Sequence, residues 1–593
     1  MKQAFLRHIG YCTVFLLLSG LALLLFPRIA AAEPVEIEIS GVEDELRENV
    51  QAALAIPPGL VKDDVVNLPW LELFRDEIPQ NVREALEPFG YYDAKVESVL
   101  RKPAENEYRL LVQVTPGTPV TIQEVTIRLR GPGADERALK RIANAFRLRK
   151  GDRLDHGSYE RGKGRLQSRA RELGYLDASF PVHEILVSRA EASARITLEL
   201  DTGIQYRFGE TLFTGAPQYP QRFLQRYLDY KSGEIFSEKK LGQTQINLAS
   251  SDRFKGVLLT PEREEAQGST MPVLAQLTPL PRRRLRPGIG YGTDTGARGT
   301  VRYKDVNLFQ LGHEMNAEIK ISERLQGIAA GYLAPSYRDI KSSLGLQVNL
   351  QREDTDTYTN RLVSLEGTWN RTLEREQLLT LYLKPQWEDF TVGAQNSSSI
   401  LVLPGIRFSH RHFDDPIRPR KGYGYTLEAR GTHQFLGSDT GLIQFIAEGR
   451  AVTPLPWRFS LISRITGGIT FQNDPLQDLP ASLRFFAGGD RSVRGYAYQS
   501  LGPRDATGKV IGGKNLLTTS VELERRLFRD WALAAFFDAG NAFDAINNLR
   551  LYKGAGLGIR YFTPIGALKL DLARQIAVDN PSFRVHFSVG FEL

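Results

Sequence analysis

Two histidines and one aspartate have the spacing of a metal site. His410, His412 and Asp414 stand at alternate positions, and on a β-strand alternate side chains share one face. No further ligand follows at a recognisable spacing, so an ordinary polar strand face is the stronger interpretation. The chain has eight histidines and one cysteine, Cys12, and neither residue type forms a catalytic constellation. We therefore expect no enzyme activity, no bound metal and no cofactor.

The charge of the chain also limits its partners. A net charge of +7 over 593 residues is modest, and the basic residues are dispersed, so the sequence does not predict nucleic-acid binding. The arginine-rich segment 282–286 is a local exception. It would either contact the anionic headgroups of outer-membrane lipids or form a solvated hinge.

The N-terminus has the features of an export signal. Lys2 and Arg7 precede an apolar stretch at 14–26, and small residues lead to a cleavage site after Ala32. A membrane anchor would need about 20 apolar residues, and this stretch is shorter. We expect residues 1–32 to be a cleaved signal peptide. Because Cys12 would be removed with it, the mature chain would have no disulfide.

The first half of the chain repeats itself. The segment FGYYDA at 89–94 matches LGYLDA at 173–178, at an offset of 84 residues. A second motif, LRKGDRL at 148–154, recurs as DYKSGEIF at 229–236 and marks a third copy. Repetition at a fixed period indicates repeated structural units, and each copy predicts the element order β-α-α-β-β.

The repeated motifs resemble polypeptide-transport-associated (POTRA) domains, which share this element order and the G-Y-x-D-A turn. A single copy would be compatible with any small α+β module, and the repetition favours the POTRA interpretation. A small sheet of this kind has an exposed edge, and a strand from another chain can pair with that edge. We expect three such domains, with the boundaries 33–118, 119–203 and 204–281.

In the second half, apolar and polar residues alternate in segment after segment. The pattern is clear at 315–322, 344–351 and 568–572, and strands that cross a membrane in a barrel alternate in this way. A soluble β-sandwich would alternate too, but it would rarely contain so many similar strands. At roughly 10 residues for each crossing strand, the length predicts a transmembrane antiparallel β-barrel of about 16 strands over 282–593, with about 14 or 18 as alternatives.

The most distinctive segment is RFFAGGDRSVRGY at 484–496. It resembles the signature loop of the BamA/TamA superfamily of outer-membrane assembly factors and two-partner secretion exporters. The segments 520–522, 536–541 and 556–573 resemble the superfamily's closing strands in the same order. The resemblance implies that the loop folds back into the barrel and that its arginine pairs with acidic residues of the inner wall. The implied loop residues are Gly488, Gly489, Val493, Arg494, Gly495 and Tyr496, and the implied wall partners are Glu522 and Asp538.

The domain count narrows the resemblance. Three repeat domains directly after the signal peptide are similar to the TamA family, the outer-membrane subunits of the translocation and assembly module. That similarity implies a TamB-like, inner-membrane-anchored periplasmic partner for the POTRA domains. It also implies unfolded outer-membrane proteins, including autotransporters, as substrates, with phospholipid transport as a further role. A BamA-like general insertase and a two-partner secretion exporter are alternatives, and a passive porin is an alternative of a different class.

The closing strands of the barrel suggest a mechanism. The first strand, near 285–293, contains alternate glycines that weaken a strand, and no helix follows them as a nucleotide-binding loop would require. If this strand pairs weakly with the last strand, 583–593, the seam between them opens sideways and templates a substrate strand. The residues assigned to the barrel seam are Gly288, Gly290, Gly292, Phe587 and Phe591.

Overall fold

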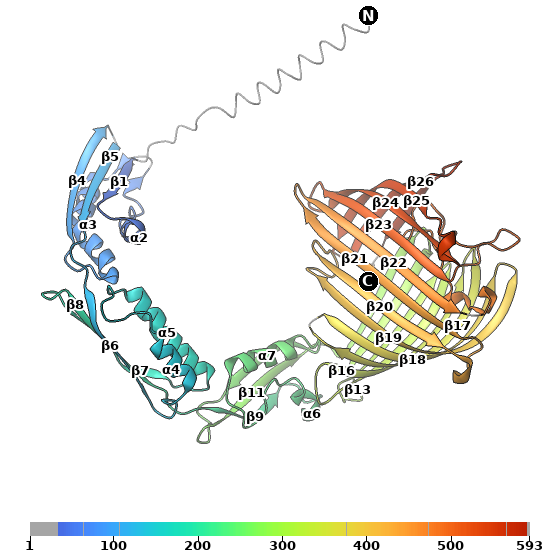
Figure 1. Cartoon of the computed structure of the whole chain (residues 1–593), viewed down its shortest axis with the longest axis horizontal. Helices are drawn as coiled ribbons and strands as arrows, with labels where there is room; N and C mark the ends of the chain where they lie inside the picture. Colours follow the sequence, from blue (N-terminus) through green and yellow to red (C-terminus); the bar gives the residue numbers. More distant parts are fainter. Residues whose placement is uncertain are drawn as a thin grey trace, which may run out of the picture. The chain divides into compact units, whose positions relative to one another are not determined.

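A computed structural model describes residues 34–62, 65–105, 107–374, 376–472, 474–564 and 566–589. The expected signal peptide and Phe591 lie outside these ranges. The chain divides into two compact units. One holds the first two α+β domains with short segments of the third, at 204–207, 233–238 and 267–270, and the other holds the rest of the third domain and the barrel (Figure 1). Within the described ranges, no helix combines the length and apolar composition that a membrane crossing requires.

The first α+β domain is a three-stranded sheet covered by two helices. Its elements are β1 (Val35–Ser40), α2 (Asp44–Ala53), the short strands β2 (Val61–Lys62) and β3 (Val65–Val66), α3 (Leu68–Leu86), β4 (Lys95–Ala104) and β5 (Glu107–Thr115). The sheet order is β1-β5-β4, with β1 parallel to β5. Alternate residues of β5, from Tyr108 to Val114, are buried in one core with residues of α3.

The second domain repeats this arrangement. Its elements are β6 (Thr121–Arg130), α4 (Arg137–Asn144), α5 (His156–Glu172), β7 (Ser179–Ser188) and β8 (Ser193–Asp201), and the sheet order is β6-β8-β7. Gly90 and Gly174 of the repeated turns have φ of +82° and +88°. Glycine adopts this left-handed conformation without strain and commonly ends a helix in it, which explains why both copies keep it.

The third domain has the same element order. Its elements are β9 (Arg207–Thr214), α6 (Gln221–Gln225), α7 (Glu238–Ala249), β10 (Phe254–Pro261) and β11 (Thr270–Pro279), in the sheet order β10-β11-β9. The predicted order β-α-α-β-β is therefore confirmed in all three domains. The first domain adds the short β2–β3 hairpin, which the repeat did not predict.

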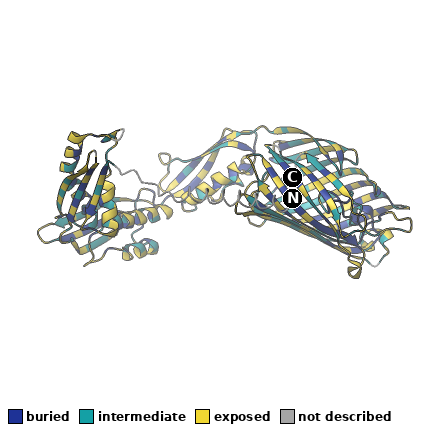
Figure 2. Ribbon diagram, turned by 90° about the horizontal axis from the view of Figure 1, so that it is seen from above, coloured by how far each residue is buried: buried dark blue, intermediate teal, exposed yellow. Residues whose placement is uncertain are grey.

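The rest of the chain is a closed antiparallel barrel of 16 strands, as predicted. The strands are β12 (Arg283–Gly292), β13 (Gly296–Leu308), β14 (His313–Ser322), β15 (Leu325–Pro335), β16 (Ser342–Asp354), β17 (Tyr358–Thr372), β18 (Gln377–Val392), β19 (Gln395–Phe413), β20 (Gly422–Thr432), β21 (Leu442–Leu455), β22 (Phe459–Gln472), β23 (Asn515–Arg526), β24 (Trp531–Phe543), β25 (Tyr552–Thr563), β26 (Gly566–Ile576) and β27 (Phe583–Val589). Figure 2 shows buried and exposed residues alternating along these strands. On β23, Val521 and Leu523 are exposed while Glu522 is buried, in the period-two alternation of a barrel strand.

The third domain contacts one end of the barrel through charged and aromatic side chains. Arg253 is buried, and its Nη2 donates to Glu314 Oε1 at 2.8 Å and to the carbonyl of Gly312 at 3.0 Å. The aromatic ring of Phe223 packs edge-on against that of Tyr337, with centroids 6.4 Å apart. The end of the barrel at the turn 309–312 therefore faces the third domain.

The arginine-rich segment 282–286 contributes to the same junction. Arg282 Nε donates to Asp305 Oδ1 at 2.8 Å, and Arg284 Nη1 donates to Asp252 Oδ1 at 2.7 Å. Burial alone would raise the pKa of Asp252, but hydrogen bonds from Arg284 and Lys304 hold this pKa below its usual value. Arg282 and Arg284 therefore bind carboxylates in the structure. This differs from both expectations for the segment, a contact with lipid headgroups and a solvated hinge.

Candidate functional site: the lumen loop and the barrel seam

A long loop between β22 and β23 folds into the barrel. Strand β12 leaves the third domain, so strands with even numbers run away from that domain and strands with odd numbers return. The loop follows β22 and therefore starts at the far end of the barrel. Its residues Ala487, Val493, Tyr496 and Leu501 form a buried apolar cluster, and Val493 is fully buried. We call the segment 484–513 the lumen loop.

Glycines shape the lumen loop where the backbone turns. Gly488, Gly489 and Gly495 have φ of +102°, +104° and +95°, a region that disfavours every residue with a Cβ. At Gly489 a Cβ would also overlap the carboxylate of Asp294. Tyr496 packs edge-on against Tyr552 of β25 at 5.5 Å between ring centroids. The structure therefore places all six residues of the predicted loop motif inside the barrel or against its wall.

Arg494 is the centre of the contact between the lumen loop and the wall. Its Nε and Nη2 donate to the two carboxylate oxygens of Asp538 at 2.7 and 2.9 Å, and its Nη1 donates to Glu522 at 2.8 Å. The guanidinium carbon lies 3.4 Å from the centre of the Phe536 ring. Arg494 is 2% exposed and Asp538 is 0% exposed, so water does not screen this ion pair.

Two further wall residues complete this network. Arg494 Nη1 also lies 3.1 Å from Asp571 Oδ2, and Arg560 Nη2 lies 2.9 Å from Glu522 Oε1. Arg560 also bonds to Asp571, so two guanidinium groups face three carboxylates. We did not predict Arg560 and Asp571 from the sequence. The alternation along the strands could have identified both residues as lumen-facing, because their neighbours Ile559, Leu570 and Leu572 face outward.

The described part of the seam joins the end of β12 to β27. Tyr291 pairs with Val589 and Gly292 pairs with Ser588, and the backbone N–H and the hydroxyl of Thr293 donate to the carbonyl of Phe587 at 3.0 and 3.1 Å. On its other side, β27 pairs with β26 from Leu568 to Arg574. Gly288 and Gly290 lie on β12, and a Cβ at Gly290 would approach the carbonyl oxygen of Val589. Phe587 lies beside the seam, where its ring centroid is 6.2 Å from that of Tyr291.

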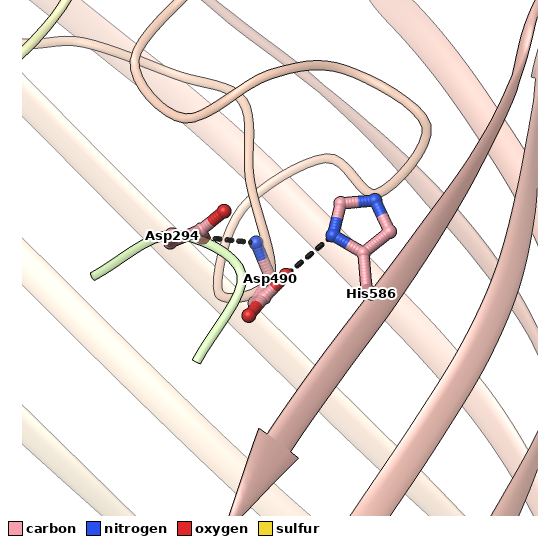
Figure 3. A group of neighbouring side chains, drawn as sticks. All are labelled: Asp294, Asp490 and His586. Carbon is pink, nitrogen blue, oxygen red and sulfur yellow. Dashed lines mark hydrogen bonds and ion pairs between the residues drawn. The ribbon is translucent and has the colours of Figure 1, made fainter. Parts of the chain in front are cut away.

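Three polar side chains connect the lumen loop to both strands of the seam (Figure 3). Asp294, in the turn after β12, accepts a hydrogen bond from the backbone N–H of Asp490 at 2.6 Å. The carboxylate of Asp490 bonds to Nδ1 of His586 on β27. His586 Nε2 in turn accepts the backbone N–H of Gly495 at 2.9 Å. We call Asp294, Asp490 and His586 the seam latch.

The seam latch has ligand types that a metal ion could use. Its three ligand atoms lie within 4.8 Å of one another, and zinc accepts both carboxylate oxygen and imidazole nitrogen. However, His586 Nε2 accepts the Gly495 N–H, so the proton of the neutral ring must sit on Nδ1. A metal ion bound to Nδ1 would require the proton of the neutral ring to move to Nε2. There it would face the N–H of Gly495, and that hydrogen bond would be lost. The geometry therefore fits a hydrogen-bonded latch better than a metal site.

The histidines first considered as metal ligands lie apart from this site. His410 and His412 are on β19, and His412 Nδ1 bonds to Glu376 at 2.7 Å. Asp414 accepts the backbone N–H groups of Arg420 and Lys421 at 2.8 and 3.1 Å. A turn and a cross-strand pair thus account for these polar groups, in agreement with the interpretation as an ordinary strand face.

Comparisons with known families identify two parts of the chain. Residues 307–593 match the Omp85 superfamily domain. Residues 36–116 match the POTRA domain described as TamA domain 1. The first match covers the lumen loop and strands β14 to β27, and the second covers the first α+β domain.

Two relatives and one solved structure are similar to the chain. The outer membrane protein assembly factor BamA of Nitratidesulfovibrio vulgaris is 25% identical over 454 residues, 70% of this chain and 55% of the relative. BamA of Neorickettsia risticii is 20% identical over 520 residues, 82% of this chain and 68% of the relative. The crystal structure of BamA from Haemophilus ducreyi lacking POTRA domains 1–3 has a TM-score of 0.65 and 16% identity, over 79% of this chain and 99% of that structure. This chain therefore spans about half the length of the first relative.

Proposed function

Because residues 307–593 match the Omp85 superfamily domain, we propose that this outer-membrane protein assembles other proteins into or across the membrane. The seam carries the proposal. The glycines at 288, 290 and 292 of β12 weaken strand pairing where the first strand meets the last, which favours separation of these strands. A separated strand presents unpaired backbone groups to which a strand of an unfolded protein can add.

The match of residues 36–116 supports a narrower proposal. That segment matches a POTRA domain of the TamA type, which favours a TamA-like subunit working with a TamB-like partner bound to its periplasmic domains. The relatives named BamA favour a second candidate, a general insertase. A two-partner exporter is a further alternative within the assembly class. The buried lumen loop argues against a passive porin, because a water-filled channel would leave Val493 and Arg494 exposed.

Reconstitution tests the assembly function directly. We expect liposomes containing the full chain to insert a urea-unfolded outer-membrane barrel about tenfold faster than empty liposomes, a barrier lower by about 1.4 kcal/mol. The folded client is recognised by its faster migration on unheated electrophoresis gels. Liposomes with an equal amount of a porin are the control for protein in the bilayer. Equal insertion rates with the chain and with the porin would refute the proposal.

Affinity purification from gently solubilised envelopes tests the partner. We expect a large inner-membrane-anchored periplasmic protein to copurify with the full chain, because a TamA-like subunit would hold it through the periplasmic domains. A set of assembly lipoproteins in its place would favour the BamA-like insertase. A single secreted protein would favour a dedicated exporter. A chain lacking residues 34–115 is the control, and retention of the partner by this variant would exclude the first domain as its binding site.

A further inference from the structure

A cavity lined by arginines lies at the end of the barrel that faces the third domain. Its volume is about 330 Å³, and it is lined by Trp457, Arg458, Arg525, Arg526 and Leu527. These residues belong to the turn after β21 and to the end of β23 with the turn that follows. Strands with odd numbers return toward the third domain, so both turns lie at the periplasmic rim. The cavity is on the opposite end of the barrel from the seam latch.

The two outer arginines of this cavity lack carboxylate partners among the described residues. In the part of the chain that the structure describes, neither Arg458 nor Arg525 forms an ion pair, and the lining contains no acidic residue. The guanidinium carbon of Arg525 lies over the Phe459 ring, 5.3 Å from its centroid. Arg526 lies in the inward register of Glu522 and Glu524, opposite the buried Ala532, so it does not contribute to a ligand site on the outer face. A guanidinium group without a carboxylate partner gains from binding an anion, which applies to Arg458 and Arg525.

The composition of the cavity favours one class of ligand. Three arginines and no acidic residue line it. Guanidinium groups bind phosphate oxygens through short, charge-assisted hydrogen bonds that are often bidentate. The excess of guanidinium groups therefore favours a phosphate over a cation or a neutral ligand.

The apolar surroundings indicate that the phosphate belongs to a lipid. Trp457 is 84% exposed and Phe528 is 71% exposed, and tryptophan and other aromatic side chains gather where a barrel meets the headgroup layer. Along β23, Val521 and Leu523 face outward in the same alternation as Arg525. An acyl chain on this wall would place its headgroup beside Arg525. We propose that the cavity binds the phosphate group of an anionic phospholipid in the periplasmic leaflet.

Calorimetric titration of the full chain, in an uncharged detergent, with dioctanoyl phosphatidylglycerol tests the proposal. We expect Arg458→Gln and Arg525→Gln each to weaken binding about fivefold, since a basic residue contributes about 1 kcal/mol to attraction for anionic lipid. The double variant should bind more weakly than either single variant. Arg525→Lys, which keeps the charge, should lose less affinity. Arg338→Gln is the matched control, because Arg338 is an exposed arginine of another turn at the same rim.

Two further ligands identify the source of the phosphate. Inorganic phosphate and dioctanoyl phosphatidylcholine should bind at least about tenfold more weakly than phosphatidylglycerol, because the first lacks acyl chains and the second has no net charge. Equal binding of inorganic phosphate would show a site for small anions and overturn the lipid proposal. Equal binding of phosphatidylcholine, or equal affinity of the double variant and Arg338→Gln, would overturn it too. The titration contains no client protein, so its failure is distinguishable from failure of the assembly function.

Discussion

We expect Tyr291→Cys combined with Val589→Cys to abolish client insertion under oxidising conditions, and a reducing agent to restore it. Tyr291 and Val589 are directly paired across the seam. Side chains in such a pair have Cβ atoms about 4.5–5.5 Å apart, close to the separation that a disulfide spans. The bond would hold β12 and β27 together, so the seam could not separate to accept a client strand. The reconstituted insertion assay measures the effect.

The control for this experiment is a disulfide elsewhere in the wall. Leu350 and Val363 form a direct pair between β16 and β17, and both are exposed on the outer face. Leu350→Cys with Val363→Cys should form a disulfide without changing the insertion rate. The single cysteine variants at 291 and 589 should also remain active. Full activity of the oxidised seam pair, with the disulfide confirmed by mass spectrometry, would exclude lateral opening as the route of insertion.

The second large effect is expected at Arg494. Arg494→Ala should lower the free energy of unfolding by about 3–5 kcal/mol, because removal of one partner of a buried ion pair leaves uncompensated charge. Asp538 is fully buried and would lose the bidentate contact, and Arg560 alone would face the three carboxylates. Arg494→Lys should have an intermediate effect, since lysine keeps the charge but loses the planar fork and the stacking on Phe536. Urea titration of the barrel in detergent measures these differences.

A second-site change separates this charge effect from a general loss of packing. Adding Asp538→Asn to Arg494→Ala should recover part of the lost stability, because it removes the carboxylate that the first change left unpaired. Arg338→Ala, at an exposed position, should leave the free energy of unfolding within about 0.5 kcal/mol of the starting value. Equal stability of Arg494→Ala and Arg338→Ala would show that the lumen loop is not held by its arginine.

The lumen loop and the seam are mechanically connected. The loop is held to the wall through Arg494, and four residues earlier Asp490 joins the turn after β12 to His586 of β27. Separation of the seam strands must therefore break the seam latch or carry part of the loop with one strand. A client strand that replaces β12 beside β27 would also compete with the position of Asp294. This connection gives the loop a physical route to influence opening.

The sequence determined which side chains face the lumen. Side chains of a strand alternate strictly, so the outward positions of Val521 and Leu523 placed Glu522 inside, and the leucines at 570 and 572 placed Asp571 inside. The repeat likewise determined the order of elements in the three α+β domains, because the helices and the glycine turns depend on local sequence. The barrel class followed from the same alternation. The number of strands was bounded only by length, because alternation does not specify where the sheet closes.

Which inward-facing groups meet depends on the three-dimensional fold of the barrel and its loop. Glu522, Arg560 and Asp571 come from β23, β25 and β26, and the lumen loop carries Arg494 to them. The members of the seam latch are more distant still, because Asp490 is 196 residues from Asp294 and 96 residues from His586. Alternation along a strand gives a direction for each side chain but no partner across the barrel. Those partners depend on closure of the sheet, on its register and on the path of the loop, which are set by contacts between segments far apart in the sequence.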